Sequence, residues 1–220
     1  ITNNRCERGE VLGDPKEDAV KAQLMEKKKN KEKVPNLYRT REKLLFREYP
    51  YTLTEPEKDV TIGLPRVLFF WETMPFWTTF WRSLGFRVKI SDPSTRKMYE
   101  SGLSAVTSDT VCFPAKLVHG HLRNLAKKHV DRIFMPSVTT VPSENTEQTS
   151  QSMCAVVKGY PIVIRNSDNP ETRDQIPFDA PLFHWYEPED RNRQLTLYME
   201  ETFGIAKESV LAAIRMADEA

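Results

Sequence analysis

The most reactive side chains of this sequence gather in one stretch, SDTVCFPAKLVHGH at residues 108–121. The stretch places a cysteine, a lysine and two histidines around the predicted start of a helix. Ser108 or Asp109 can cap this helix, and Pro114 suits its first turn. The free N–H groups at such a helix start would stabilise a Cys112 thiolate or a bound anion.

The spacing within this helix determines which side chains can act together. Cys112, Lys116 and His119 recur at four- and three-residue intervals and therefore share one face. Gly120 disfavours a helix by roughly 1 kcal/mol, but it also permits the close approach of another backbone. On a helix His121 points about 200° away from His119, so the two form a weak metal site. We interpret His119 as a hydrogen-bond partner near Cys112 and His121 as a core histidine.

The three cysteines of the chain are Cys6, Cys112 and Cys154. Their odd number and wide separations argue against a zinc ribbon, a ferredoxin-type run and a disulfide framework. Two interpretations stay open: isolated thiols that act as small hydrophobic residues, or thiols that the fold assembles into a cluster. Cys154 also lies near a predicted helix start. Two such cysteines on one side of an α/β sheet can converge, and iron–sulfur clusters need thiolates whose charge is offset by nearby dipoles.

The overall composition excludes several classes of partner. Lys and Arg total 32 against 31 Asp and Glu, so no net field attracts nucleic acid or anionic lipid. The longest apolar run, Val67 to Trp71, is too short to span a membrane, and no secretion signal opens the chain. We therefore predict a cytoplasmic protein without a membrane or nucleic-acid partner. Because the chain begins at Ile1 and its last predicted helix runs to Ala220, we expect it to be part of a longer protein.

The pattern along the chain predicts two regions. Residues 1–58 form a helical arm or linker, with a solvated helix at 14–33 and a second helix at 37–49. Residues 59–220 form an α/β domain. Within it, strands are predicted at 60–65, 86–91, 131–136 and 161–165, and helices at 67–85, 94–101, 108–121, 152–158, 188–203 and 207–220. Residues 166–177 are predicted as a loop.

This alternation predicts a doubly wound, mostly parallel, Rossmann-like sheet with C-terminal helices. Its active surface should lie where the strands end, at Pro65, Ser91, Ser137 and Arg165. The aromatic helix at 67–85 is interpreted as buried against the sheet or a partner, with a cofactor stacking platform as the alternative. The sequence contains no GxGxxG, Walker A, GxSxG or HExxH motif, which argues against the commonest nucleotide-binding and hydrolase sites.

Residues 62–164 resemble a known family. The shared features are a GxPR opening, an aromatic PFW helix, LGFRV, the block S-x-x-V-C-x-P-A-K-x-x-H-G-H and the strand D-x-I-F-x-P. They are similar to the domain that follows the activase ATPase modules in large 2-hydroxyacyl-CoA dehydratase activator-related proteins. The opening NNRCERG also resembles the cysteine-bearing segment that joins the activase modules to this domain.

The resemblance implies a system in which an ATP-driven activase passes one electron to a dehydratase-like iron–sulfur partner. It implies an activase module fused upstream and dehydratase subunits as partners. It makes Cys112 and Cys154 the candidate ligands of a [4Fe–4S] cluster, with Cys6 as the third, and Lys116 and His119 neighbouring groups that tune its charge. The enzyme class implied is a 2-hydroxyacyl-CoA dehydratase-like lyase or a low-potential reductase, and this fragment alone is not expected to be active.

The chain departs from the family pattern at two positions. Ser137 follows Pro136 where relatives often have cysteine, and Ala155 follows Cys154 where proline is common. Serine is a poor cluster ligand, so an altered cluster or none is also compatible with the sequence.

Three hypotheses therefore stay open. The first is an iron–sulfur electron-transfer or reductase component. The second is a non-catalytic domain that docks the activase or dehydratase through the aromatic helix and the charged arm. The third is a cluster-free acyl-CoA binding domain that contacts phosphates through basic groups such as Arg66 or Lys116.

Overall fold

A computed structural model describes residues 26, 35–141, 151–185 and 187–220. The chain divides into two compact units, Ile1–Leu44 and Leu45–Ala220, and every strand of the described residues lies in the second unit. Cys6 and nearly all of the helix predicted at 14–33 lie outside the described residues. Helix α2 (Leu37–Leu45) buries none of its side chains and ends earlier than predicted. None of the helices in the described part of the chain is both long and apolar enough to cross a membrane.

The second unit is built on a parallel sheet. Its strands are β1 (Thr61–Leu64), β2 (Arg87–Ile90), β3 (Arg132–Phe134) and β5 (Phe178–Asp179), in the order β2-β1-β3-β5. The central strand β1 is buried along its whole length, as expected for a parallel strand that is covered on both faces. A second, two-stranded parallel sheet pairs β4 (Ser137–Val138) with β6 (Leu182–Phe183). The predicted α/β class with a parallel sheet is confirmed.

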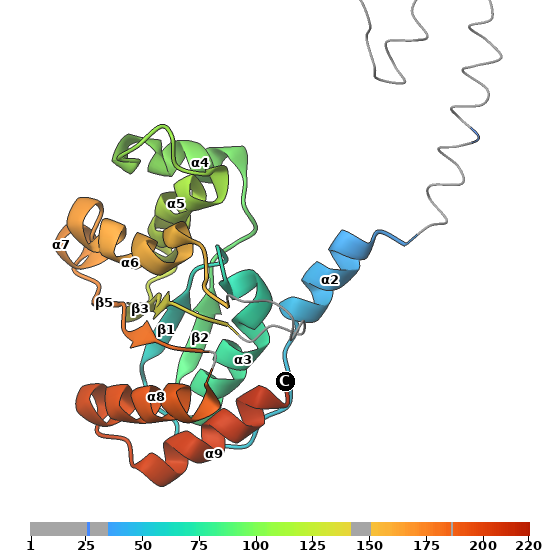
Figure 1. The fold of residues 1–220 in the computed structure, drawn as a ribbon, viewed down its shortest axis with the longest axis vertical. Helices are drawn as coiled ribbons and strands as arrows, with labels where there is room; N and C mark the ends of the chain where they lie inside the picture. Colours follow the sequence, from blue (N-terminus) through green and yellow to red (C-terminus); the bar gives the residue numbers. More distant parts are fainter. Residues whose placement is uncertain (1–25, 27–34, 142–150, 186) are drawn as a thin grey trace, which may run out of the picture. The chain divides into compact units, whose positions relative to one another are not determined.

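Helices cover both faces of the sheet (Figure 1). Strand β2 lies on one side of β1 in the sheet, and β3 and then β5 lie on the other side. The connection from β1 to β2 therefore runs across the sheet in the opposite direction to the connections from β2 to β3 and from β3 to β5. Because such crossovers are right-handed, their helices lie on opposite faces of the sheet. The helices on one side are α3 (Phe70–Ser83), α8 (Pro188–Phe203) and α9 (Lys207–Asp218). Those on the other side are α4 (Arg96–Gly102), α5 (Phe113–Lys127), α6 (Ala155–Ser167) and α7 (Pro170–Asp174), with a 3₁₀ turn at Leu103–Ala105.

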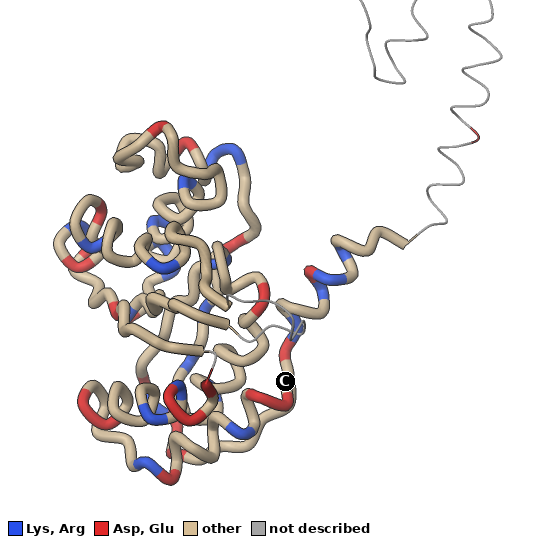
Figure 2. The backbone as a smooth tube through the Cα atoms, viewed as in Figure 1, with Lys and Arg blue, Asp and Glu red and all other residues tan. Residues whose placement is uncertain are grey.

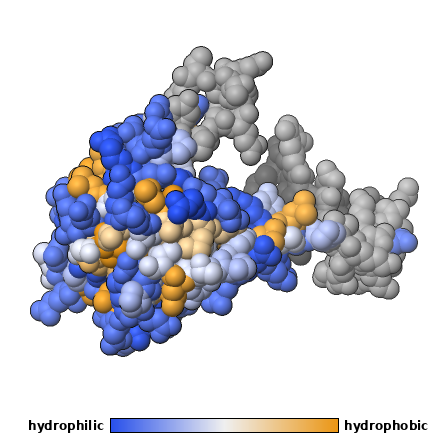
Figure 3. All heavy atoms as spheres, turned by 90° about the horizontal axis from the view of Figure 1, so that it is seen from below, coloured by the Kyte–Doolittle hydropathy of each residue, from blue (hydrophilic) through white to orange (hydrophobic). Residues whose placement is uncertain are grey.

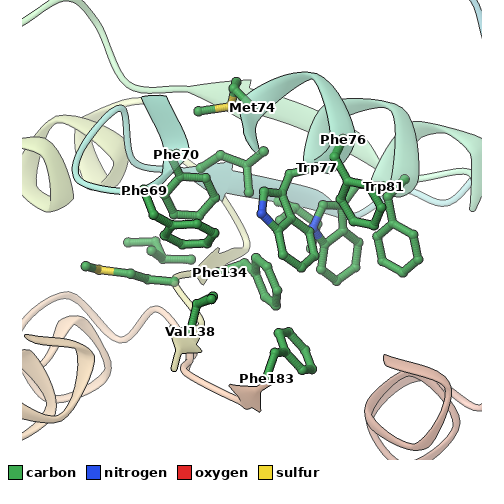
Figure 4. Packing of buried hydrophobic residues seen from close by; sticks show 14 of the residues in the cluster. Phe69, Phe70, Met74, Phe76, Trp77, Trp81, Phe134, Val138 and Phe183 are labelled. Carbon is green, nitrogen blue, oxygen red and sulfur yellow. The ribbon is translucent and has the colours of Figure 1, made fainter. Parts of the chain in front are cut away.

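The aromatic helix α3 forms the centre of the hydrophobic core (Figure 4). Trp77 and Trp81 are fully buried, and their rings lie 4.7 and 5.2 Å from the ring of Phe134 on β3. Aromatic rings at such distances add roughly 1 kcal/mol per pair beyond the burial of their area. The interpretation of this helix as buried against the sheet is confirmed.

The strand predicted at 161–165 is wrong, because these residues form the second half of α6. The buried side chains of this helix, Val157, Tyr160, Pro161 and Ile164, recur at helical spacing, and the helix packs against β4 and α5. A short run of branched apolar residues does not distinguish a strand from a buried helix. The strand that pairs with β3 is β5 instead, and α7 lies in a stretch that we predicted as a loop. Arg165 therefore lies in the last turn of a helix and not at the end of a strand.

The surface carries mixed charge and scattered apolar groups. Segments with Lys or Arg and segments with Asp or Glu are interspersed over the second unit (Figure 2). The face seen in Figure 3 is mainly hydrophilic, with hydrophobic residues in separate groups. Such scattered apolar residues are normal for a folded domain and do not by themselves mark a binding surface.

Candidate functional site

The two described cysteines occupy equivalent places in the fold. Cys112 is the N-cap of α5 and Cys154 is the N-cap of α6, with almost identical backbone angles and exposed thiols. The backbone N–H of Val157 donates to Cys154 Sγ at 3.4 Å. The predicted placement of both cysteines at helix starts is confirmed. The expectation that Ser108 or Asp109 caps the first helix is wrong, because these residues build the preceding turn, in which the Ser108 and Thr110 hydroxyls lie 2.8 Å apart.

Both helix starts lie on the side of the sheet where the strands end, which we call the carboxyl edge. Helix α5 leads into β3 and α6 leads towards β5, so each runs antiparallel to the strands and begins at this edge. Ser137 also follows β3 at this edge, but it is buried, and its hydroxyl donates to the backbone carbonyl of Lys158 in α6. Ser137 therefore connects β4 to α6.

His119 is fully buried, and both of its ring nitrogens have partners. Its Nδ1 lies 2.7 Å from Oδ2 of Asp168, and its Nε2 lies 3.0 Å from the hydroxyl of Tyr160. We predicted His119 as a hydrogen-bond partner near Cys112. The residues that pair with its ring are Asp168 and Tyr160. Because both nitrogens are engaged, His119 does not offer a metal ligand in this arrangement.

Asp168 is held as a carboxylate. Burial raises its pKa, but the hydrogen bonds from His119 and Arg173 and the charges of Arg173 and Arg123 outweigh burial and lower the pKa below its ordinary value. Arg123 Nη1 lies 3.0 Å from Asp168 Oδ2, and Arg173 binds Oδ1. An ionised Asp168 accepts the hydrogen of His119 Nδ1. The Tyr160 hydroxyl pairs with the other ring nitrogen, Nε2.

Tyr160 closes this buried network on the side of α6. It is 4% exposed, and its pKa is raised above all by burial and further by negative charge at Cys112 and Asp168. It lies six residues into α6 from Cys154. Sequence reasoning missed Tyr160, Asp168, Arg123 and Arg173. The available signal was the helical spacing of Val157, Tyr160 and Ile164, which puts Tyr160 on the buried face of a helix.

Lys116 and the remaining cysteine do not complete a metal site. Lys116 Nζ donates to the backbone carbonyl of Asp109 at 2.7 Å, so it braces the turn that precedes Cys112. Cys6 lies outside the described residues. Within the ranges that the structure describes, no three His, Cys, Asp or Glu side chains are grouped closely enough to hold a metal ion. The described part of the site thus consists of two exposed thiols and one buried polar network.

His121 lies on the opposite side of α5 in different surroundings. Its Nδ1 and Nε2 lie 2.7 and 2.9 Å from the hydroxyls of Ser91 and Ser94. Burial and, to a lesser degree, the charge of Arg66 lower its pKa to about 4, against a slight opposing effect of Asp92. The neutral, hydrogen-bonded ring agrees with the interpretation of His121 as a core histidine.

Two further sequence expectations can be compared with the structure. A Cβ on Gly120 would lie 2.2 Å from the carbonyl oxygen of Met98, so this glycine does permit the close approach of α4. Arg66 is 8% exposed, and its guanidinium lies 3.7 Å from the ring centroid of Phe46 and 5.1 Å from that of Trp71. The guanidinium of Arg66 thus packs on aromatic rings of the same unit.

Comparison with known proteins identifies the family. One protein-family model, described as the CoA enzyme activase uncharacterised domain (DUF2229), matches residues 61–220. The chain belongs to this family. The match covers the whole parallel sheet and both cysteine-capped helices, so these features are parts of an activase-associated domain. No curated protein and no solved structure matches the chain.

Membership in this family connects the domain to a CoA enzyme activase system and to an activase-related partnership. The part of the chain before residue 61 lies outside the match, and so does Cys6. Cys112 and Cys154 both lie within the matched region.

Proposed function

We propose that this activase-associated domain is an electron-transfer component of a CoA enzyme activase system and that it binds an iron–sulfur cluster through Cys112 and Cys154. One observation carries the proposal: both cysteines are exposed N-caps of helices that begin at the carboxyl edge of one parallel sheet.

The physical argument rests on charge. Thiolates are the form of cysteine that ligates iron, and the free N–H groups at a helix start stabilise them. The N–H of Val157 already donates to Cys154. Because both thiols are exposed, a cluster at this edge would stay within reach of a redox partner. A bound cluster of this kind accepts and donates one electron at low potential.

The donor set limits the type of site. A [4Fe–4S] cluster takes four protein ligands, whereas the chain has three cysteines and the described residues supply two of them. In this proposal Cys6 is the third ligand and a partner supplies the fourth. The partners are an activase ATPase module that donates the electron, in the same longer polypeptide, and a dehydratase of the 2-hydroxyacyl-CoA type that receives it.

Each of the two other hypotheses loses part of its support, while the charged arm of the docking hypothesis lies almost entirely outside the described residues. Docking through the aromatic helix requires an exposed helix, whereas α3 is buried in the core. Phosphate binding by Arg66 or Lys116 requires free cations, whereas Arg66 is stacked on Phe46 and Lys116 is bonded to Asp109.

The test is an assay of iron and acid-labile sulfide, with visible absorption, on protein purified without oxygen. Cys112→Ser and Cys154→Ser are the matched variants, because serine is a good N-cap but a poor cluster ligand. We expect stoichiometric iron in the native chain, its loss in both variants and a partial loss in Cys6→Ser. Iron-free protein after reconstitution with iron and sulfide, or full iron retention in both N-cap variants, would contradict the proposal.

A further inference from the structure

Helix α6 is apolar on the side that faces solvent as well as on the side that it buries. Opposite its buried residues, the helical period places Ala155, Gly159 and Ile162, and Ile162 is 58% exposed. Half-buried Val156 and Val163 continue this surface along one flank. We call the surface of these five residues the outer face of α6. A helix that is apolar all round is normally covered on every side.

Two other helices of the same unit present charge to solvent instead. Helix α8 exposes Glu189, Arg193 and Glu200, and α9 exposes Lys207 and Arg215. Helix α6 packs mainly against β4 and α5, which cover only its buried side. Within the part of the chain that the structure describes, the outer face of α6 therefore lacks a cover.

Gly159 lies in the middle of this face, and its own unit gives no reason for a glycine there. Its backbone is not in the left-handed region, and a Cβ at this position would meet no described atom within 4 Å. A glycine inside a helix nevertheless costs about 1 kcal/mol relative to alanine. The missing side chain leaves room for the close approach of another backbone, which is a use of glycine that only a partner would supply here.

Positive charge lines the other flank of the outer face. Lys158 and Arg165 are seven residues apart, so they lie on one side of the helix about 10 Å apart along its axis. Lys158 Nζ lies 2.7 Å from the hydroxyl of Ser152, and Arg165 Nη2 lies 3.5 Å from the carbonyl oxygen of Phe178. Neither cation pairs with a carboxylate of the described residues, and Ala155–Ser167 contains no Asp or Glu.

We infer that the outer face of α6 docks an acidic amphipathic helix of a partner protein. The apolar stripe of that helix covers Ile162 and the valines, its backbone approaches at Gly159, and carboxylates beside the stripe pair with Lys158 and Arg165. Because Ala155 directly follows Cys154, a partner on this face would lie next to the exposed thiol at the start of the helix.

The charge of the face favours this occupant over two others. A second copy of the chain, bound through the same face, would bring more cations and no carboxylate from α6 to neutralise them. An anionic membrane would satisfy Lys158 and Arg165, but a lipid surface makes no use of the single open position at Gly159. A helix with a narrow apolar stripe and acidic flanks satisfies both features.

The test uses three stapled helical peptides of equal length and the full chain. The peptides share a stripe of Leu and Ala, and two positions beside the stripe, seven residues apart, carry Glu, Gln or Lys. Fluorescence anisotropy measures binding at about 50 mM salt, where screening is weak. We expect the Glu peptide to bind about tenfold or more tightly than the Lys peptide, with the Gln peptide between them, because two pairs of opposite charges attract and two pairs of like charges repel.

Variants of the chain then locate the binding surface. Lys158→Glu combined with Arg165→Glu should reverse the order of the three peptides. Lys207→Glu combined with Arg215→Glu makes the same change of charge on exposed positions of α9 and should leave the order unchanged. Ile162→Gln should weaken binding of the Glu peptide about fivefold or more, because less apolar surface is buried. Thermal unfolding of each variant checks that it folds.

Several results would overturn the inference. They are equal affinities of the Glu and Lys peptides for the native chain, no binding of the Glu peptide, and an unchanged order in the charge-reversed α6 variant. A dimer in sedimentation velocity that Ile162→Gln dissociates would assign the face to a second copy. Binding to phosphatidylglycerol vesicles that the charge-reversed variant loses would assign it to a membrane.

The comparison of peptides on the native chain decides the matter even where a variant does not fold. None of these measurements requires a bound cluster. The docking face can therefore fail while the iron assay succeeds, and iron-free protein leaves the docking face testable.

Discussion

His119 and His121 are separated by one residue on α5 and are both fully buried, but their surroundings are opposite in electrostatic character. His119 contacts an ionised Asp168, which two arginines hold in place. His121 contacts only hydroxyl groups, and the nearby charge of Arg66 disfavours its protonation. One helix therefore presents the same side chain to two environments, one built around a carboxylate and one built from hydroxyl groups.

This difference shows why histidine spacing alone says little about function. The two rings point to opposite sides of α5, so one meets α6 and α7 while the other meets the segment after β2. A metal site would need both rings on one side. The structure instead divides the two histidines between a charged network and a neutral one.

Removing the Asp168 carboxylate should cause the largest loss of stability. Asp168→Asn leaves Arg123, Arg173 and His119 without their common anion, and breaking a buried charged network costs about 3–5 kcal/mol. Urea unfolding of the native chain and the variant measures the loss. Glu100→Gln, which breaks the exposed pair with Arg96, is the matched control and should cost less than about 1 kcal/mol. Equal losses in the two variants would contradict the assignment of Asp168 as the centre of the network.

The second-largest loss of stability should come from acid, through protonation of His121. Its folded pKa of about 4 lies below the ordinary value of 6.5, so the unfolded chain binds more protons between these values and stability falls as pH falls through this window. The shift corresponds to a loss of about 3 kcal/mol at most. Asp168 has a lowered pKa, so its own contribution is lost only below its ordinary value of 3.8. Unfolding free energies between pH 7 and 4 should show this slope in the native chain, and His121→Gln should remove most of it. A slope that persists in His121→Gln would locate the titrating group elsewhere.

The smallest expected effect concerns the glycine between the two histidines. Gly120→Ala brings a Cβ against the carbonyl of Met98 and should destabilise the domain by about 2 kcal/mol, because α4 must move away from α5. Gly159→Ala on α6 is the control. A Cβ at that position meets no atom within 4 Å, so the gain in helix propensity should stabilise the domain by up to about 1 kcal/mol. Thermal unfolding of both variants measures the contrast, and a destabilised Gly159→Ala would show that its surroundings are closed.

Much of the fold could be predicted because its signals are local. The buried strand at Thr61–Leu64, the aromatic period of α3 and the strand at Arg87–Ile90 each depend on neighbouring residues. The error at 161–165 arose where the local signal is ambiguous, since branched apolar residues occur both in strands and on the buried faces of helices. That error hid Tyr160, because a strand would have separated it from the helix that Cys154 begins.

The sequence by itself determined where the reactive groups enter the fold. Helix starts and strand ends depend on caps, prolines and short-range periodicity, so Cys112 and Cys154 could be placed at helix N-termini without a structure. Only the tertiary structure decided what each histidine touches. Asp168 and Tyr160 lie 49 and 41 residues from His119 along the chain, and Ser91 and Ser94 lie 30 and 27 residues from His121. Contacts over such separations depend on how the helices pack on the sheet, and no local pattern encodes them.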